Sequence, residues 1–302
     1  MAKRERKSKS KQKSFFVSLA FIVAVIAAIL GRFNKSFDSV SNTALNAGNV
    51  VGVHFIDVGQ GSSVLLQSEK SGVLIDAGEK EYGESVVRYI KSQGVEKLDY
   101  VIATHPHTDH IGGLTAVLNR IDVGAVIMPE LAAENVPTTK TYQNLLETMA
   151  QKKIKAIAAK PGKNYTVGKI NFEVLGPVSQ ENDLNNMSVV CKADVNSTTF
   201  LLTGDAEKPE MKEIMTLSPN LSCDIMLMSH HGSKTALESS FLSAAAPNLA
   251  VISCGDGNSY DHPHEEVIKY LQDNNIKYYR TDKAGSIIVF CANSGYSVKT
   301  QK

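Results

Sequence analysis

The chain has 302 residues, of which 43% are hydrophobic, so it can bury a large core in one or two domains. Its net charge of +1 is unevenly spread. Residues 1–14 hold seven of the 32 Lys and Arg and one of the 31 Asp and Glu. Residues 15–302 therefore hold 25 basic and 30 acidic residues, a net charge of −5. This mildly acidic body argues against a broad nucleic-acid-binding face, although it leaves room for a local basic groove.

The first predicted element is a membrane segment. Residues 15–30 are uncharged and apolar on every face, and the run approaches the ~20 residues that cross a bilayer. The basic arm 1–14 on its N-terminal side predicts a cytoplasmic N-terminus, which places the following residues outside the cell membrane. We favour an uncleaved single-pass anchor over residues 15–32, with a cleaved signal peptide and a secreted product as the alternative. The polar, aperiodic stretch 33–49 is interpreted as a linker.

The remaining residues, 50–302, alternate short β-branched runs with helical stretches. Strands are expected at 51–57, 62–67, 72–76, 99–103, 124–128, 154–159, 170–175, 187–193, 197–203, 223–228, 249–254, 276–280 and 286–290. Helices are expected at 82–93, 112–119, 139–152, 207–216, 238–245 and 264–274. This order predicts an α/β fold in which outer helices cover sheets and functional loops lie at strand ends.

Four cysteines lie in or beside apolar, strand-like runs: Cys191, Cys223, Cys254 and Cys291. None forms a closely spaced metal-binding pair. In a domain of this size, we expect buried thiols, with disulfides as the alternative for an exported protein.

The loop after the expected strand 99–103 holds a dense cluster of potential metal ligands, His105-Pro-His107-Thr-Asp109-His110. Imidazole and carboxylate groups are the usual ligands of zinc and its first-row neighbours. Side chains alternate in an extended segment, so His105 and His107 can hold one ion, while Asp109 and His110 in the following turn can face a second. A ligand set without thiolate suits a metal that polarises an oxygen, as hydrolysis requires. The alternative is an exposed polar loop.

Carboxylates at the ends of apolar runs are further candidates. Asp205 follows Gly204 at the end of a strand, where a carboxylate is costly to bury without a cation, and it can also cap the helix 207–216. Asp57 and Asp76 each follow an apolar run, and they are interpreted as loop-shaping groups or as neighbours of ligands. Asp57, with the glycines around Gln60, can also line a cleft and offer backbone N–H groups to a phosphate.

A late loop, after the expected strand 249–254, carries Asn258, Tyr260 and His262. A neutral or protonated His262 can bind a phosphoryl oxygen or protonate a leaving alkoxide. The alternative is an ordinary surface turn before the helix 264–274.

Several of these segments, in this order, resemble the metallo-β-lactamase superfamily of binuclear metallohydrolases. The matching segments are 73–78, 105–110, 200–205 and 229–233. The resemblance covers roughly residues 50–300. It implies a metallo-β-lactamase-like αββα four-layer sandwich, with two central sheets and a metal cleft along one edge, preceded here by the one N-terminal transmembrane helix.

The resemblance also implies a role for each candidate. The metal ligands are expected to be His105 and His107 for one ion, Asp109, His110 and His231 for the other, and Asp205 as a bridge. His231 is favoured over His230 because the family places a ligand histidine before a glycine at this turn. His230 is then expected to contact substrate or orient a ligand. The expected catalytic groups are Asp109, His230 and His262, and the expected substrate-binding groups are Asp57, Gln60, Asn258, Tyr260 and His262.

Two further segments, 55–61 and 258–263, narrow the resemblance to the hydrolase domain of ComEC-type DNA-uptake proteins. Many superfamily members supply a third histidine to the first metal, but residues 111–204 contain none, and Asn185-Asn186-Met187-Ser188 occupies about that place. Without a third histidine, the first metal site has fewer protein ligands and more open coordination positions. Two divalent cations are expected; zinc is favoured, and manganese is the harder alternative for a site with fewer imidazoles.

The sequence therefore predicts a membrane-anchored extracytoplasmic phosphodiesterase, a nuclease acting on DNA. A role in DNA uptake would require a separate channel protein as partner. The same centre could instead hydrolyse another envelope ester, such as a phosphorylcholine ester, a lactone or a β-lactam. A third alternative is a non-catalytic DNA- or wall-binding module with a structural metal, although the open positions of the ligand set argue against it.

Overall fold

The computed structural model describes residues 51–218 and 220–302. The predicted arm 1–14, membrane segment 15–32 and linker 33–49 lie outside this range. Within it, the helices are all too short or too polar to cross a bilayer. The described residues belong to one compact unit that runs from Leu45 to Lys302.

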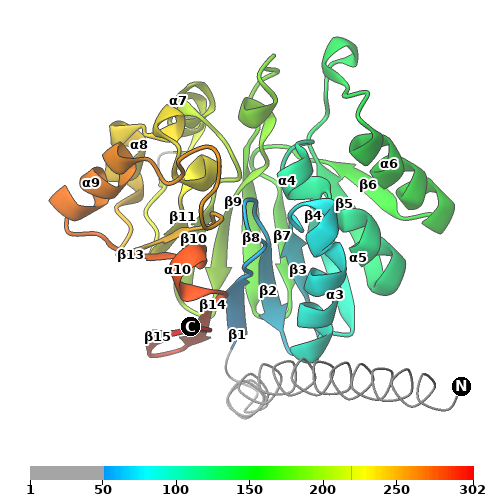
Figure 1. Cartoon of the computed structure of the whole chain (residues 1–302), viewed down its shortest axis with the longest axis horizontal. Coiled ribbons are helices and arrows are strands. Elements are labelled where there is room, and N and C mark those ends of the chain that lie inside the picture. The colour runs from blue at the N-terminus through cyan, green and yellow to red at the C-terminus, as the bar shows by residue number, and fades with distance from the viewer. Residues whose placement is uncertain (1–50, 219) are drawn as a thin grey trace, which may run out of the picture. The chain divides into compact units, whose positions relative to one another are not determined.

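Among the described residues, the strands form two mixed sheets (Figure 1). The first sheet has the order β15-β14-β1-β2-β3-β4-β5-β6. Its strands are β1 (Val51–Phe55), β2 (Val64–Ser68), β3 (Ser71–Ile75), β4 (Lys97–Ile102), β5 (Asp122–Met128), β6 (Lys155–Ala158), β14 (Ile287–Ala292) and β15 (Gly295–Thr300). The second sheet has the order β13-β12-β11-β10-β9-β8-β7. Its strands are β7 (Asn164–Val167), β8 (Ile170–Gly176), β9 (Val190–Val195), β10 (Thr198–Leu202), β11 (Ile225–Leu227), β12 (Leu249–Ile252) and β13 (Lys277–Arg280).

Helices cover the outer face of each sheet. Those of the first half are α3 (Gly83–Ser92), α4 (Thr108–Ile111), α5 (Leu114–Arg120) and α6 (Lys140–Lys152), and those of the second half are α7 (Lys208–Leu217), α8 (Ser239–Ala245), α9 (Glu265–Asp273) and α10 (Thr281–Ala284). Apolar residues of α3, α5 and α6 pack on the first sheet, and those of α7, α8 and α9 pack on the second. Figure 1 shows the resulting αββα layers, with the two sheets in the middle.

The central strands are apolar on both faces because each face is covered. In β3, Val73 and Ile75 enter the core between the sheets, whereas Leu74 packs under the outer helices. In β10, Phe200 and Leu202 point into the inner core and Leu201 points toward the helices of the second half. Such uninterrupted apolar runs are typical of strands covered on both sides. The side-chain period of two thus places alternate residues in different layers.

Most predicted elements are present, with shifts at their ends. The structure adds the edge strands β7 and β15 and the single-turn helices α4 and α10, which the sequence did not predict. The edge strands have few buried side chains, so their hydrophobic pattern is weak. The hairpin between β9 and β10 turns at Asn196 and Ser197, because β9 continues through Val195. The four cysteines are free, buried thiols.

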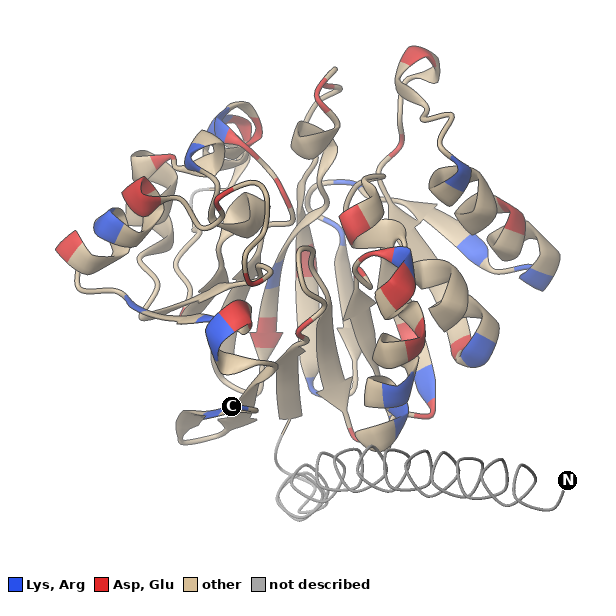
Figure 2. Ribbon diagram, viewed as in Figure 1, with Lys and Arg blue, Asp and Glu red and all other residues tan. Residues whose placement is uncertain are grey.

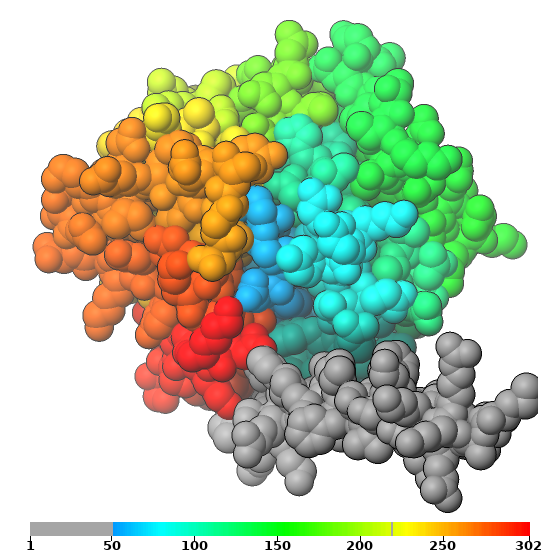
Figure 3. Space-filling view, viewed as in Figure 1, coloured from blue at the N-terminus to red at the C-terminus, as the bar shows by residue number. Residues whose placement is uncertain are grey.

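The strand topology brings several loops to one edge of the sandwich. Strands β3, β4 and β5 run parallel to one another, as do β10, β11 and β12, so their carboxyl ends carry neighbouring loops. The loop after β1 joins them: in the space-filling view this segment (blue) lies between the α3 region (cyan) and the late residues (orange) (Figure 3). The contact of Gly255 N–H with Gln60 Oε1 at 3.1 Å agrees with that placement.

Candidate metal centre

The loop after β4 presents the first half of the site. His105 and His107 lie in the extended segment before α4, and Nε2 of His105 is 3.0 Å from Nδ1 of His107. Asp109 and His110 lie in α4 itself, as the turn at this point requires. One continuous stretch therefore supplies four candidate ligands; His107 and Asp109 line the cleft, and His105 and His110 are buried behind them.

The second half comes from the loops after β10 and β11. Gly204 adopts a positive φ of +51°, and a side chain there would press on Ser188 and Thr104 at 3.1 Å, so the turn that presents Asp205 favours glycine. His230 and His231 are both left-handed, with φ of 50° and 56°. Such a conformation costs a non-glycine residue roughly 1–2 kcal/mol, and its presence at two successive positions marks a constrained turn.

Four of the predicted ligands converge in one group. The donor atoms of Asp109, His110, Asp205 and His231 all lie within 4.8 Å of one another. His110 Nε2 is 3.1 Å from Asp205 Oδ1 and 3.3 Å from His231 Nε2. His231 Nε2 is 3.1 Å from Asp109 Oδ2. The structure thus brings together residues separated by more than a hundred positions, and it places His231 rather than His230 in this group.

The far nitrogen of each imidazole in this group is bonded to an acceptor. His110 Nδ1 donates to Asp76 Oδ2 at 2.7 Å, and His231 Nδ1 donates to the Ser253 carbonyl at 2.9 Å. In the neutral form of either ring, Nε2 then presents its lone pair toward the other Nε2 and toward the carboxylates. Four donor atoms at this spacing can share one cation, and imidazoles fixed through Nδ1 are the usual arrangement at metal sites. The donor set fits a divalent metal ion.

The electrostatics of the apoprotein agree with this arrangement. Burial alone would raise the pKa of Asp205, but His110 and His231 beside it hold that pKa well below its usual range. Burial opposes a proton on His110, yet Asp205 and Asp76 raise the pKa of that imidazole well above its usual value. A metal ion at Nε2 would take the place of the proton that faces Asp205, while Nδ1–H stays bonded to Asp76.

Asp205 also reaches the first pair of histidines. Its Oδ2 lies 3.8 Å from His105 Nε2, whereas Oδ1 faces His110. His105 Nδ1 contacts the hydroxyls of Thr104 and Ser188 at 3.1 and 3.3 Å. Oδ2 also lies 3.6 Å from His231 Nε2, so the Asp205 carboxylate stands between the two pairs of histidines. A carboxylate in this place can bridge two ions, which is the role that the resemblance implies for Asp205.

His230 lies beside this group but outside it. Its Nδ1 is 3.0 Å from Glu207 Oε1, and its Nε2 is 3.7 Å from Asp205 Oδ2. Burial opposes a proton on His230, but the bond to Glu207 raises its pKa. His230 is thus held at the cleft wall by a carboxylate that sequence analysis missed.

The late loop closes one side of the cleft. The Asn258 side chain stabilises this loop by four hydrogen bonds. Its Oδ1 accepts from the N–H groups of Tyr260 and His262, and its Nδ2 donates to the carbonyls of Gly255 and His262. Asn258 therefore shapes the loop, whereas Tyr260 and His262 line the cavity. Burial lowers the pKa of His262 to about 4, with further lowering by His231 and His230.

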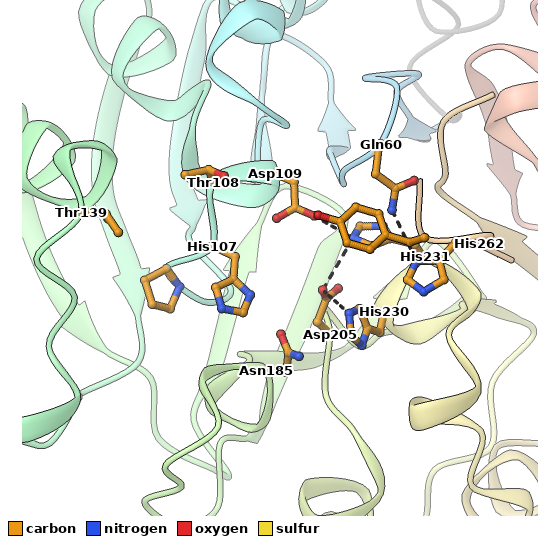
Figure 4. A pocket seen from close by; sticks show the side chains of 12 residues that line it. Gln60, His107, Thr108, Asp109, Thr139, Asn185, Asp205, His230, His231 and His262 are labelled. Atoms are coloured by element: carbon orange, nitrogen blue, oxygen red, sulfur yellow. Dashed lines mark hydrogen bonds and ion pairs between the residues drawn. The ribbon is translucent and has the colours of Figure 1, made fainter. Parts of the chain in front are cut away.

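These groups surround a cavity of about 440 Å³, into which Asp109, Asp205, His230, His231 and His262 point (Figure 4). Gln60 also lines it, as predicted, but Asp57 does not. The Asp57 carboxylate accepts from Gly59 N–H at 3.2 Å and faces Lys302 Nζ at 3.8 Å, so it shapes the loop that carries Gln60. Contact of Asp57 with substrate stays a prediction, since the residue lies in the loop that carries Gln60 but not among the residues that line this cavity.

Several supporting residues escaped sequence analysis. Thr104 donates to Asp76 through both its N–H and its hydroxyl, at 2.9 and 2.6 Å, and Ser188 Oγ accepts from Asp205 N–H at 3.0 Å. Thr104 directly precedes His105, and this position next to the ligand motif could have identified it as a supporting residue. The Ser253 carbonyl gives no side-chain signal, because a backbone acceptor can belong to any residue.

Comparison with known proteins agrees with the fold. The family described as "Metallo-beta-lactamase superfamily" matches residues 56–256. "ComE operon protein 3" of Bacillus subtilis (strain 168) is 31% identical over 78% of this chain and 32% of its own length. "Competence protein ComA" of Neisseria gonorrhoeae is 29% identical over 84% of this chain and 34% of its own length. The chain spans about a third of the length of these relatives, which are competence proteins of the ComEC type.

Among solved structures, CmlA, a diiron beta-hydroxylase from Streptomyces venezuelae, is similar with a TM-score of 0.53 and 13% identity. The match covers 76% of this chain and 52% of that chain. At this identity, the similarity concerns the fold alone.

Proposed function

The chain belongs to the metallo-beta-lactamase superfamily, and from this premise we propose that it is a metal-dependent phosphodiesterase that cleaves DNA outside the cytoplasmic membrane. The observation that carries the proposal is the convergence of Asp109, His110, Asp205 and His231 in an accessible cavity. The competence relatives favour DNA as the substrate class. The basic arm 1–14 and the apolar run 15–30 favour a membrane anchor over residues 15–32, with any uptake channel contributed by a separate protein.

The metal ions are proposed to bind on both sides of Asp205. His105, His107 and Asp205 would hold one divalent ion, and Asp109, His110, His231 and Asp205 the other. When bound, such ions supply Lewis-acid activation of water and offset the negative charge that builds on the ester oxygens. Each side offers two imidazoles, which suit zinc, and the carboxylates of Asp205 and Asp109 also suit a harder ion such as manganese.

The cavity itself contains little positive charge. No Lys or Arg is among the residues that line it, and Figure 2 shows basic and acidic residues interspersed over the outer helices of the described chain. A phosphate in this cavity would therefore be neutralised mainly by the metal ions and by hydrogen-bond donors of the wall. This property favours an ester that is recognised locally over tight binding of a long polyanion.

His262 is one such donor, and its tautomer follows from Gln60. Gln60 Oε1 accepts from Gly255 N–H, which turns Nε2 of the amide toward His262 Nδ1 at 3.4 Å. Because an amide N–H₂ group can only donate, His262 Nδ1 is the acceptor and the ring proton lies on Nε2. A neutral His262 thus offers an N–H group to a phosphoryl or leaving-group oxygen in the cavity, and Tyr260 stacks on its ring with centroids 5.6 Å apart.

The decisive experiment compares substrates on the full chain in detergent, loaded with zinc or with manganese. We expect turnover of a chromogenic phosphodiester and degradation of DNA, with no turnover of nitrocefin. Nitrocefin or lactone hydrolysis without phosphodiester turnover would replace the nuclease with another esterase or lactamase. Tight DNA binding without turnover of any ester would indicate a binding module instead.

A further inference from the structure

The two sides of the cleft differ in their supply of donors. The group within 4.8 Å contains four residues, but neither His105 nor His107 belongs to it. On their side the evident donors are the two imidazoles, 3.0 Å apart, and Asp205 Oδ2 at 3.8 Å from His105 Nε2. Residues 111–204 supply no histidine to this side, and His230, whose Nε2 lies 3.7 Å from Asp205 Oδ2, is bonded through Nδ1 to Glu207.

Asn185 provides an unused acceptor at this place. It lies in the 3₁₀ helix Leu184–Met187 between β8 and β9, and it lines the same cavity as His107 and Asp205. Its Oδ1 is buried and has no hydrogen-bond partner among the described residues. Figure 4 shows this oxygen turned toward the space between His107 and Asp205. Buried amide oxygens are nearly always paired, so an unpaired one that faces a ligand-rich cavity indicates a missing partner.

The neighbours of Asn185 are fully engaged in building the loop. Asn186 Oδ1 accepts from Glu207 N–H at 3.0 Å, and Ser188 Oγ joins Asp205 N–H to His105. The backbone of Asn185 is fixed as well, since its N–H donates to Asp183 Oδ1 at 3.0 Å and its carbonyl accepts from Ser188 N–H at 3.1 Å. The loop is thus tied to the metal ligands from both sides, while Oδ1 of Asn185 has no bond within residues 51–218 and 220–302.

We propose that Asn185 Oδ1 is a ligand of the divalent cation held by His105, His107 and Asp205. The inference rests on the proposed metal centre and adds to it a fourth protein donor. An amide oxygen is a harder donor than an imidazole, so this side favours a hard ion such as Mn²⁺ more than a three-histidine site does. The other side also has two imidazoles, His110 and His231, and takes its oxygen donors from Asp109 and Asp205.

The test measures metal binding and does not depend on activity. Mn²⁺ is titrated into the full chain in detergent, and the free ion is counted by its electron paramagnetic resonance signal. We expect two Mn²⁺ per chain in the wild type and at least a tenfold loss of affinity at one site in Asn185→Leu. The matched control, Asn182→Leu, changes an exposed asparagine of the same loop and should leave both constants within twofold.

Two further variants keep the inference testable if Asn185→Leu does not fold. Asn185→Asp retains an oxygen donor and adds charge, so Mn²⁺ should bind more tightly, which a purely structural asparagine does not predict. Asn185→His supplies the missing imidazole and should raise the ratio of Zn²⁺ to Mn²⁺ affinity at that site.

Unchanged Mn²⁺ constants in Asn185→Leu and Asn185→Asp would overturn the role of Asn185 and leave the nuclease proposal intact, provided that the wild type binds two ions and cleaves phosphodiesters. A wild type that binds no divalent ion would overturn both.

Discussion

The cleft and the outer layer of the second sheet each bury a carboxyl group, and the two groups behave in opposite ways. Asp205 is 2% exposed, and although burial alone would raise its pKa, His110 and His231 hold it well below the usual range. Glu210, in α7, is fully buried, and burial raises its pKa to about 8. Only Val178 N–H donates to Glu210 Oε1, at 3.0 Å, and Oε2 has no partner among the described residues. Burial by itself therefore does not identify the site; convergent imidazoles do.

The largest effect is expected for Asp205→Asn, which removes the carboxylate between the two sides of the cleft. Phosphodiester turnover should fall by more than the roughly 10–100-fold that loss of an orienting residue costs, because both metal positions lose a ligand. Steady-state kinetics and metal content measured on the same preparation check this. Asp122→Asn, an exposed change at the start of β5, serves as the control. Retained turnover and two retained metal ions would remove Asp205 from the centre.

A smaller effect is expected for Asp76→Asn. The carboxylate accepts from His110 Nδ1 and from Thr104, so its loss leaves the His110 ring free to turn or to change tautomer. Metal affinity should fall roughly 10–100-fold, as it does when other orienting carboxylates are removed. Isothermal titration with zinc measures the change. Unaltered zinc affinity would reduce Asp76 to a loop-shaping residue.

Gln60→Glu tests the tautomer of His262 at the cleft wall. A carboxylate can only accept, so it should move the ring proton of His262 to Nδ1 and remove the N–H group from the cavity. Turnover should drop by about tenfold, the size of one hydrogen bond of ~1–1.5 kcal/mol. Nitrogen chemical shifts of ¹⁵N-labelled histidine report the tautomer directly. A wild-type protein that already carries the proton on Nδ1 would contradict the assignment.

The smallest effect on activity, and the clearest on stability, is expected for Glu210→Gln. The folded pKa of about 8 lies above the unfolded value of 4.5, so the folded state keeps a proton that the unfolded state releases as pH rises between them. The wild type should therefore lose stability from pH 4.5 to 8, while the amide removes this loss.

Glu213 and Glu181 face the same carboxyl and raise its pKa further, so both are left unchanged in the variant. The stability difference between Glu210→Gln and wild type should grow by about 1–3 kcal/mol over this range, the scale of an unpaired buried polar group. Urea denaturation at several pH values measures it. A constant difference across the range would mean that Glu210 is ionised in the folded protein.

The sequence alone predicted the α/β class, most strands and helices, and the local ligand motif. His105, His107, Asp109 and His110 lie within six positions, so their proximity follows from the chain itself. The apolar runs of β3 and β10 reveal buried strands for the same local reason. Edge strands such as β15 were not predicted, because their side chains are largely exposed and show little hydrophobic pattern.

Only the tertiary structure decided which distant groups meet. It placed His231 in the four-residue group and His230 against Glu207, and it left Asn185 Oδ1 without a partner among the described residues, in the cavity that His107 also lines. These outcomes depend on the parallel pairing of β10, β11 and β12 and on the approach of two sheets, and contacts between such distant segments leave no mark in the local residue pattern. The sequence determined which chemical groups were available, and the packing of the sheets determined which of them face one another.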